Sequence, residues 1–249
     1  MERPLGLSNP LDAERHISVD LGIEQVTRRL AETMSANAFL STHSRLVADL
    51  NRFEYDEECI PIVADCTEIP MNKALSSKAR RERLEKYFFP AHAAIDRLID
   101  DVAAEHREKP FVFRLHSFAR TLREKPEDPR HQDICVYNYP EFGRDPVFDT
   151  FLRTLRRQNP SLHIGNNDPF AGRTPGFPDK ERSAAPVSYR HLVQRNNQRT
   201  VAVEIRQDLI TSADGQQLYA GILAGALHEA FGFHIASQCS PRFPLPRAD

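Results

Sequence analysis

Segment 111–117 reads Phe111-Val112-Phe113-Arg114-Leu115-His116-Ser117 and follows Pro110, which breaks the preceding helical pattern. Its length and apolar content predict a buried β-strand, because strands covered on both faces are nearly continuous apolar runs. The run ends in a polar pair, so His116 is expected at the carboxyl end of the strand. Open α/β sheets bind their ligands at that end, and the segment therefore indicates both the fold and a candidate site.

Further strands and helices alternate on both sides of this segment. Apolar residues at helical spacing predict helices, and short apolar runs bounded by polar or turn residues predict strands. The alternation predicts a single α/β domain whose central sheet, mostly parallel or mixed, is flanked by helices. The expected strands are 38–40, 45–50, 133–137, 162–165 and 200–205, and the expected helices are 20–36, 76–106 in two pieces divided near Pro90, 147–157 and 216–228.

The length of 249 residues and the hydrophobic content of 40% suit one domain with a substantial core. We assign this domain to residues 1–239. The remaining segment, 240–249, contains three prolines and is expected to be an extended tail. Two long segments without periodicity, 120–131 and 166–199, are expected to be loops, which at that length are either functional rims or poorly ordered.

The charge balance bears on the partners of the protein. With 33 basic and 35 acidic residues, the formal net charge is -2, so electrostatics favour neither nucleic acid nor an anionic membrane as a partner. No apolar run approaches the roughly 20 residues that span a bilayer, and no signal peptide is recognisable. The four cysteines lack the spacing of a zinc site, which favours a reduced, cytoplasmic compartment without disulfides. The expected partner is a small-molecule substrate, and the sequence favours no particular oligomeric state.

An amide and a guanidinium stand side by side in Asp49-Leu50-Asn51-Arg52, at the end of the apolar run Arg45-Leu46-Val47-Ala48. An arginine held there offers two parallel donors to a carboxylate, and the asparagine adds a neutral donor. The pair Asn51 and Arg52 therefore indicates a carboxylate-binding site. The alternative is a solvated arginine or a structural ion pair.

Two further side chains could carry chemistry. His116, at the end of a buried strand, can present a neutral imidazole nitrogen to a metal, or it can be a hydrogen-bonded structural histidine. Glu204 interrupts the apolar strand that runs from Thr200 to Ile205. A carboxylate buried there must be paired, bound to a metal or held with a raised pKa as a general base. An ion pair of Glu204 with an arginine, without a catalytic role, is the alternative.

Five segments together resemble the N-formylglutamate amidohydrolase family in order and spacing, over about residues 5–230. That family is related in fold to zinc carboxypeptidases and aspartoacylase-type hydrolases, so the resemblance implies a zinc-exopeptidase-like fold. The segments are Arg15-His16-Ile17-Ser18-Val19-Asp20-Leu21-Gly22, Ser44 to Arg52, Leu115-His116-Ser117-Phe118, Gly165-Asn166-Asn167-Asp168-Pro169-Phe170 and Val203 to Ile210.

The resemblance implies an amidase that uses zinc, or another divalent metal, to hydrolyse N-formyl-L-glutamate or a similar N-acyl amino acid. His116 matches a zinc ligand of the family, and Glu204 matches the general base of the carboxypeptidase relatives. Asn51 and Arg52 match the pair that binds the substrate carboxylate there. A glutamate moiety carries a second carboxylate, for which Arg45 or Arg206 is the candidate anchor.

The metal site is the part of the pattern that departs from the family. Members usually begin with a strand that ends in a ligand histidine, whereas this sequence begins Met1-Glu2-Arg3-Pro4. Either the start lies upstream or the metal site lacks one ligand. His16 and Asp20 could contribute to the site, although Asp20 is equally suited to cap the helix that follows it. The alternative function is therefore a catalytically impaired member that binds an acyl amino acid without efficient turnover.

Overall fold

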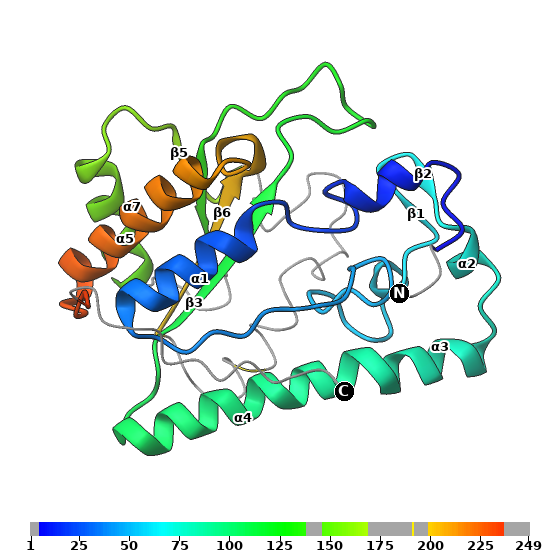
Figure 1. Cartoon of the computed structure of the whole chain (residues 1–249), viewed down its shortest axis with the longest axis horizontal. Helices are drawn as coiled ribbons and strands as arrows, with labels where there is room; N and C mark the ends of the chain where they lie inside the picture. Colours follow the sequence, from blue (N-terminus) through cyan, green and yellow to red (C-terminus); the bar gives the residue numbers. More distant parts are fainter. Residues whose placement is uncertain (1–4, 138–145, 169–190, 192–198, 237–249) are drawn as a thin grey trace.

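The computed structural model describes residues 5–137, 146–168, 191 and 199–236, and these form an α/β fold with a mixed sheet flanked by helices (Figure 1). The predicted fold class is therefore confirmed. The predicted tail at 240–249 and most of the predicted loop at 166–199 lie outside the described residues. Within the described part, no helix is long and apolar enough to cross a membrane.

Within the described residues, the central sheet has four strands in the order β3-β6-β4-β5. Strand β6 is parallel to β3 and antiparallel to β4, and β5 is parallel to β4, so the sheet is mixed. The four strand predictions from residue 111 onward are confirmed with small shifts of their ends. The strands are β3 (Val112–Phe118), β4 (Ile134–Tyr137), β5 (Ile164–Asn166) and β6 (Thr200–Arg206).

Alternate residues of each strand divide the sheet into two faces of different chemistry. On one face, Val201, Val203 and Ile205 of β6 join Ile134 and Val136 of β4 in the main hydrophobic core. The intervening residues point to the opposite face, as side chains in a strand must. This second face, which we call the site face, carries His116, Glu204 and Tyr137 among others.

Three helices cover the core face: α1 (Ile23–Met34), α5 (Pro146–Gln158) and α7 (Ala213–Phe231). Figure 1 shows them gathered on one side of the sheet. Each contributes apolar residues at helical spacing, such as Val26 and Leu30 of α1 and Phe151 and Leu155 of α5. The helices predicted at 20–36, 147–157 and 216–228 are thus confirmed.

The predicted helical region 76–106 forms one long, nearly continuous rod in two α-helical pieces (Figure 1). Helix α3 (Ser77–Arg83) and helix α4 (Phe89–His106) are joined by a π-helical segment, Leu84–Phe88. Pro90 lies in the first turn of α4 and has no backbone N–H to donate to the preceding turn. The wider π turn before it accommodates this missing hydrogen bond. The prediction of two pieces is confirmed, and the junction is a bulge without a break in direction.

The strands predicted at 38–40 and 45–50 are wrong, because this region consists of turns and irregular chain. The Ser44 hydroxyl accepts a hydrogen bond from the Leu46 backbone at 3.1 Å, and the Val47 N–H donates to the Ser44 carbonyl at 2.9 Å. Such local bonds compete with strand pairing. The small elements nearby are η1 (Pro10–Glu14), η2 (Glu57–Cys59), the antiparallel pair β1 (Val63–Ala64) and β2 (Thr67–Glu68), α2 (Pro70–Lys73) and, after β6, η6 (Gln207–Leu209).

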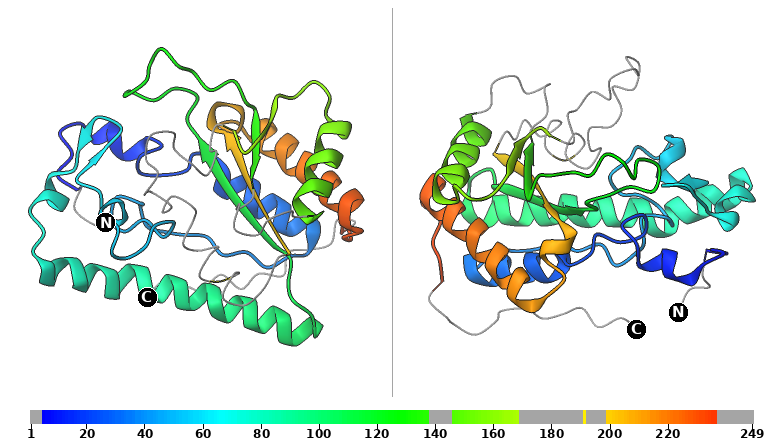
Figure 2. Two further views of the ribbon diagram at one scale, coloured as in Figure 1. Left: turned by 180° about the vertical axis from the view of Figure 1, so that it is seen from behind. Right: turned by 90° about the horizontal axis from the view of Figure 1, so that it is seen from above.

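The predicted loop at 120–131 joins β3 to β4 and extends well beyond the sheet (Figure 2). Its contacts are with the N-terminal part of the chain. Arg123 forms an ion pair with Asp12 at 3.0 Å, and the backbone N–H of Glu124 donates to Asp65 at 3.1 Å. The loop is therefore held as a rim beside the site face.

Replacing Gly22 with alanine is expected to destabilise the protein by about 2 kcal/mol or more. Gly22 precedes α1 with a φ of +76°, and an added Cβ would lie 2.2 Å from the Ile210 carbonyl oxygen. Thermal unfolding measures the effect. Gly221→Ala is the matched control: Gly221 is exposed in α7 with no atom near its added Cβ, so this change should be neutral or stabilising. Equal melting temperatures for Gly22→Ala and the wild type would contradict the packing described at this turn.

Candidate functional site

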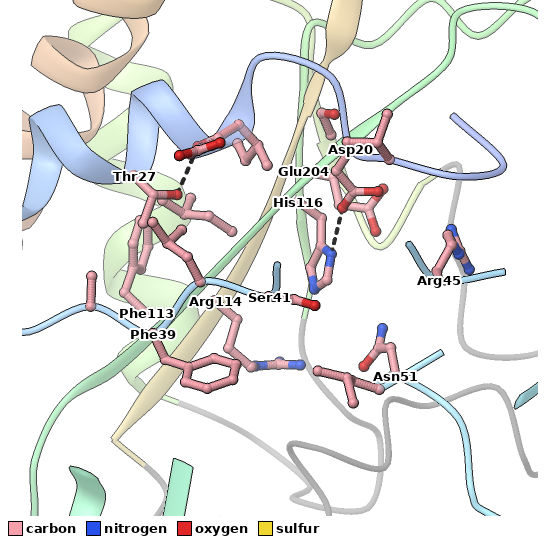
Figure 3. Close-up of a pocket in the computed structure, with 18 of the residues that line it drawn as sticks. Asp20, Thr27, Phe39, Ser41, Arg45, Asn51, Phe113, Arg114, His116 and Glu204 are labelled. Carbon is pink, nitrogen blue, oxygen red and sulfur yellow. Dashed lines mark hydrogen bonds and ion pairs between the residues drawn. The ribbon is translucent and has the colours of Figure 1, made fainter. Parts of the chain in front are cut away.

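The centre of the site face is a group of three side chains from separate parts of the chain, His116, Asp20 and Glu204 (Figure 3). His116 of β3 and Glu204 of β6 are register partners on adjacent parallel strands. Asp20 precedes α1, and its Oδ2 atom lies 2.8 Å from Nδ1 of His116. All three line one cleft. The sequence prediction that His116 and Glu204 belong to one site is thus matched by their placement.

The bond between His116 and Asp20 orients the imidazole. Burial raises the pKa of Asp20, but the hydrogen bond and charge of His116 outweigh it, so the pKa of Asp20 is lowered and the group is a carboxylate. Nδ1 of His116 therefore donates, which leaves Nε2 as the other ring atom for chemistry. Burial lowers the pKa of His116, yet the bond to Asp20 more than compensates, and the net pKa is raised. The Asp20 carboxylate thus favours a protonated His116.

Asp20 is not the cap of α1, which was one of the two roles predicted for it. Gly22 occupies the N-cap position, and no side chain caps this end of the helix. The carboxylate of Asp20 turns to His116 instead. Asp20 lies just before α1, and α1 packs on the core face of the sheet that contains β3. The Asp20 carboxylate can therefore reach His116 on β3.

Glu204 is the carboxylate with the largest change in acidity at the site. Burial raises its pKa to about 7, although the positive charge of His116 opposes this shift. The hydroxyl of Tyr137, from β4, donates a hydrogen bond to Oε1 of Glu204 at 3.1 Å. A carboxylate whose pKa lies near neutral pH can both accept and release a proton there, as a general base must. The alternative was an ion pair between Glu204 and an arginine. Among the described residues, the close side-chain contact of Glu204 is the Tyr137 hydroxyl, and no such ion pair is found there.

The predicted carboxylate anchor stands at a turn that also borders the cleft. Asp49 is buried and organises this turn by accepting a hydrogen bond from the Asn51 backbone at 2.8 Å. Arg52 donates from Nε to Glu58 at 2.9 Å and from Nη1 to the Asn51 carbonyl at 3.0 Å. Asn51 and Arg52 both line the cleft. The predicted strand end is therefore a turn, but the two anchor residues still face the same cleft as His116 and Glu204.

The two arginines predicted as a second anchor differ in position. Arg45 lines the cleft, and its Nε and Nη2 atoms contact Oδ2 of Asp49 at 3.0 and 2.7 Å. The charge of Asp49 is the main reason why the pKa of Arg45 is raised. Arg206 is not among the residues that line the cleft, and it contacts Asp133 at 3.1 Å and Asp208 at 2.8 Å. Arg206 therefore lies outside the residues that line the cleft, and Arg45 remains close to the reacting groups.

A zinc site needs at least three protein ligands, and the predicted set was His116, His16 and Asp20. Over the described ranges, no three His, Cys, Asp or Glu side chains are grouped so that they could hold a metal ion. Asp20 is engaged by Nδ1 of His116, and Nε2 of His16 lies 3.5 Å from Asp65. His16 does line the cleft. The described residues alone do not fit a zinc ion.

Three side chains at the site were missed from the sequence: Tyr137, Arg114 and Arg130. Tyr137 and Arg114 alternate with core residues of their strands, so the period of two could have placed them on the same face as His116. Arg130 belongs to the loop 120–131, and its positive charge interacts with Glu204. No periodicity exists in that loop, so nothing in the sequence indicated this contact.

The family comparison agrees with this geometry. The model of the N-formylglutamate amidohydrolase family matches residues 4–211, which is most of the chain. The chain belongs to the N-formylglutamate amidohydrolase family. This match includes Asn51, Arg52, His116 and Glu204, and membership of an amidohydrolase family supports an enzyme that hydrolyses a C–N bond other than a peptide bond.

One solved structure similar to this member of the N-formylglutamate amidohydrolase family confirms the fold. The crystal structure of gene product Atu2144 from Agrobacterium tumefaciens superposes with a TM-score of 0.76 at 24% identity, covering 92% of this chain and 83% of the other. An N-formylglutamate amidohydrolase from Ralstonia eutropha JMP134 has a TM-score of 0.45 at 17% identity, over 64% of this chain and 55% of its own, and is too distant for a comparison of sites. No curated protein matches the chain with statistical significance.

Proposed function

We propose that this protein hydrolyses N-formyl-L-glutamate, or a similar N-acyl amino acid, to formate (or the corresponding acid) and the free amino acid. The observation that carries the proposal is the arrangement around Glu204. A carboxylate with a pKa of about 7 lies beside a histidine held by Asp20, in a cleft that also exposes Asn51 and Arg52. Membership of the N-formylglutamate amidohydrolase family supports the choice of substrate.

In the first step of the proposed reaction, Glu204 accepts a proton from a water molecule that attacks the carbonyl carbon of the formyl group. The new C–O bond places negative charge on the former carbonyl oxygen. His116, whose pKa is raised by Asp20, can donate from Nε2 to this oxyanion. Tyr137 holds Glu204 in place through its hydroxyl.

In the second step, Glu204 returns the proton to the leaving nitrogen, and the C–N bond breaks. The products are formic acid and the free amino acid. Formic acid then ionises to formate and the amino group takes up that proton, so atoms and charge balance without a further reagent. Asn51 and Arg52 are proposed to hold the α-carboxylate of the substrate during both steps, because their donors match the two oxygens of a carboxylate. Zinc or another divalent metal remains a prediction of the family resemblance and is included as a variable in the test.

Incubation of the purified protein with N-formyl-L-glutamate tests the proposal. Formate and glutamate are measured in parallel samples that contain zinc, another divalent cation or a chelator. Production of both compounds in equal amounts in any sample supports hydrolysis. If folded protein binds N-formyl-L-glutamate in calorimetry but releases no formate under any condition, the impaired binding protein is the correct reading and the hydrolase is not.

The rate of hydrolysis is expected to rise with pH up to about 7 and to decline again at higher pH, where His116 loses the proton that its Nε2 atom donates while Nδ1 is bonded to Asp20. Glu204 must be ionised to accept a proton, and its pKa is raised to about 7, so the active form is the minor one below that pH. We expect kcat/KM to fall about tenfold for each pH unit below 7. A pH–rate profile with N-formyl-L-glutamate measures this limb. A midpoint near 4.5, the ordinary value for glutamic acid, would contradict the assignment of Glu204 as the base.

A further inference from the structure

The carboxylate anchor of the proposed reaction is carried by residues 46–61, which we call the turn region. The side-chain amide of Asn72, from α2, donates to the carbonyls of Leu46 at 2.8 Å and Pro61 at 2.7 Å. Asn72 is buried, and it is not among the residues that line the cleft. One amide outside the cleft therefore closes both ends of the turn region.

The middle of the turn region is held by Arg80 of α3. Its Nη2 atom donates to the carbonyls of Glu54 at 3.0 Å and Asp56 at 2.8 Å. A guanidinium can bridge two carbonyls in this way because it presents several N–H donors in one rigid plane. Arg80 is not among the residues that line the cleft, so any effect of its side chain on the reaction must pass through the turn region.

A short path of hydrogen bonds connects Arg80 with Arg52. Asp56, whose carbonyl Arg80 holds, accepts a hydrogen bond at Oδ1 from the Glu58 N–H at 2.9 Å. The Glu58 carboxylate accepts from Nε of Arg52 at 2.9 Å, and the Asn51 carbonyl accepts from Nη1 of Arg52 at 3.0 Å. Two nitrogens of the Arg52 guanidinium are thus oriented, while its other N–H groups can meet a carboxylate.

The orientation of Arg52 depends on the backbone more than on its ion pair with Glu58. The side chains of Arg52 and Glu58 are 20% and 55% exposed, and an ion pair so exposed to water contributes little by itself. The pair keeps one geometry only if the backbone that carries Glu58 is fixed. Arg80 supplies that support from a helix, which is a rigid element.

We propose that Arg80 is a positioning residue for substrate binding, which fixes the turn region so that Arg52 meets the α-carboxylate in one orientation. This inference rests on the proposed function, because it uses the role given there to Arg52. An anchor that is ordered before binding loses less conformational freedom when the ligand arrives, so it binds that ligand more tightly. His116 and Glu204 belong to the sheet, and loss of Arg80 should leave them in place.

The test compares N-formyl-L-glutamate with N-formyl-4-aminobutyrate, which lacks only the α-carboxylate. Calorimetry gives the Kd of each compound, and formate release gives kcat and KM, for the wild type and for Arg80→Met, which keeps an apolar stem without donors. We expect Kd and KM for N-formyl-L-glutamate to rise about tenfold with little change in kcat, and Kd for the analogue to stay unchanged. Arg80→Lys, whose ammonium can donate to both carbonyls, should restore most of the affinity.

Two further variants complete the test. Arg81→Met is the matched control, because Arg81 is the next residue of α3 and is exposed, so its loss should change neither Kd nor kcat. Asp56→Ala interrupts the same path nearer to Arg52 and should give the pattern expected for Arg80→Met, which keeps the inference testable if Arg80→Met does not fold. Circular dichroism establishes which variants are folded.

An unchanged Kd for N-formyl-L-glutamate in folded Arg80→Met overturns the inference, as does equal weakening of both compounds. A general structural role would lower kcat at unchanged KM, and that result also overturns it. Failure of the proposed function has a different signature: the wild type would bind N-formyl-L-glutamate and release no formate, while the Kd values of the variants would still decide the role of Arg80.

Discussion

Glu204→Gln is expected to lower kcat for N-formyl-L-glutamate by about 100- to 10,000-fold, the usual cost of losing a general base. Glutamine has the same shape but cannot accept the proton of the attacking water. Its carbonyl oxygen can still accept the hydrogen bond from the Tyr137 hydroxyl, which lies 3.1 Å from Oε1 of Glu204. Binding of the substrate should therefore change little. Steady-state assays of formate release, combined with calorimetry of binding, separate these two effects.

Stability gives this variant a second readout. Because the folded-state pKa of Glu204 is raised, its neutral form is favoured in the fold, and its contribution to the free energy of unfolding is lost as pH rises from about 4.5 through about 7. Glu204→Gln should not show this decline. Glu105→Gln, an exposed change on α4, is the control and should match the wild type in both activity and stability. Wild-type turnover by Glu204→Gln would remove Glu204 from the mechanism.

His116→Ala is expected to lower kcat/KM by at least about 100-fold. The variant loses the donor at Nε2 and leaves the carboxylates of Asp20 and Glu204 without the positive charge between them. Since the charge of His116 opposes the rise in the pKa of Glu204, the pH at which activity is half-maximal should also move upward. A pH–rate profile of the variant measures both changes.

Two variants separate the role of the imidazole from general damage. Asp20→Asn keeps His116 but removes the charge that orients it, so a smaller loss of activity is expected. His163→Ala changes an exposed histidine outside the cleft and should have no effect. If His116→Ala retained the wild-type rate and pH profile, the site would have to lie elsewhere in the cleft.

The sequence predicted those parts of the fold that depend on local patterns. Segment 111–117 and the apolar segment 200–205 became the paired strands β3 and β6, and both polar interruptions, His116 and Glu204, lie on the site face. The turn at Ser44 was missed because an apolar run is equally compatible with a strand and with a buried turn. Leu46 is fully buried in that turn, so burial alone produced the apolar pattern.

The parts of the site that depend on register could not be predicted in the same way. Tyr137 reaches Glu204 because β4 runs antiparallel to β6, and no feature of the sequence states that pairing. Asp20 was assigned either to a metal or to a helix cap, since its partner His116 is 96 positions away in the sequence. The anchor role of Arg52 stays a prediction, but its place beside the cleft depends on local contacts, because Asp49 and Asn51 organise the turn that carries it.

The most direct test of the account is the release of formate and glutamate from N-formyl-L-glutamate by the wild type and by Glu204→Gln, prepared and assayed side by side under the same metal conditions. We predict that the wild type releases the two products in equal amounts and that the variant releases about 1% of these amounts or less. Equal product from both proteins, or none from a folded wild type that binds the substrate, would contradict the central claim that Glu204 acts as the base of an amide hydrolase.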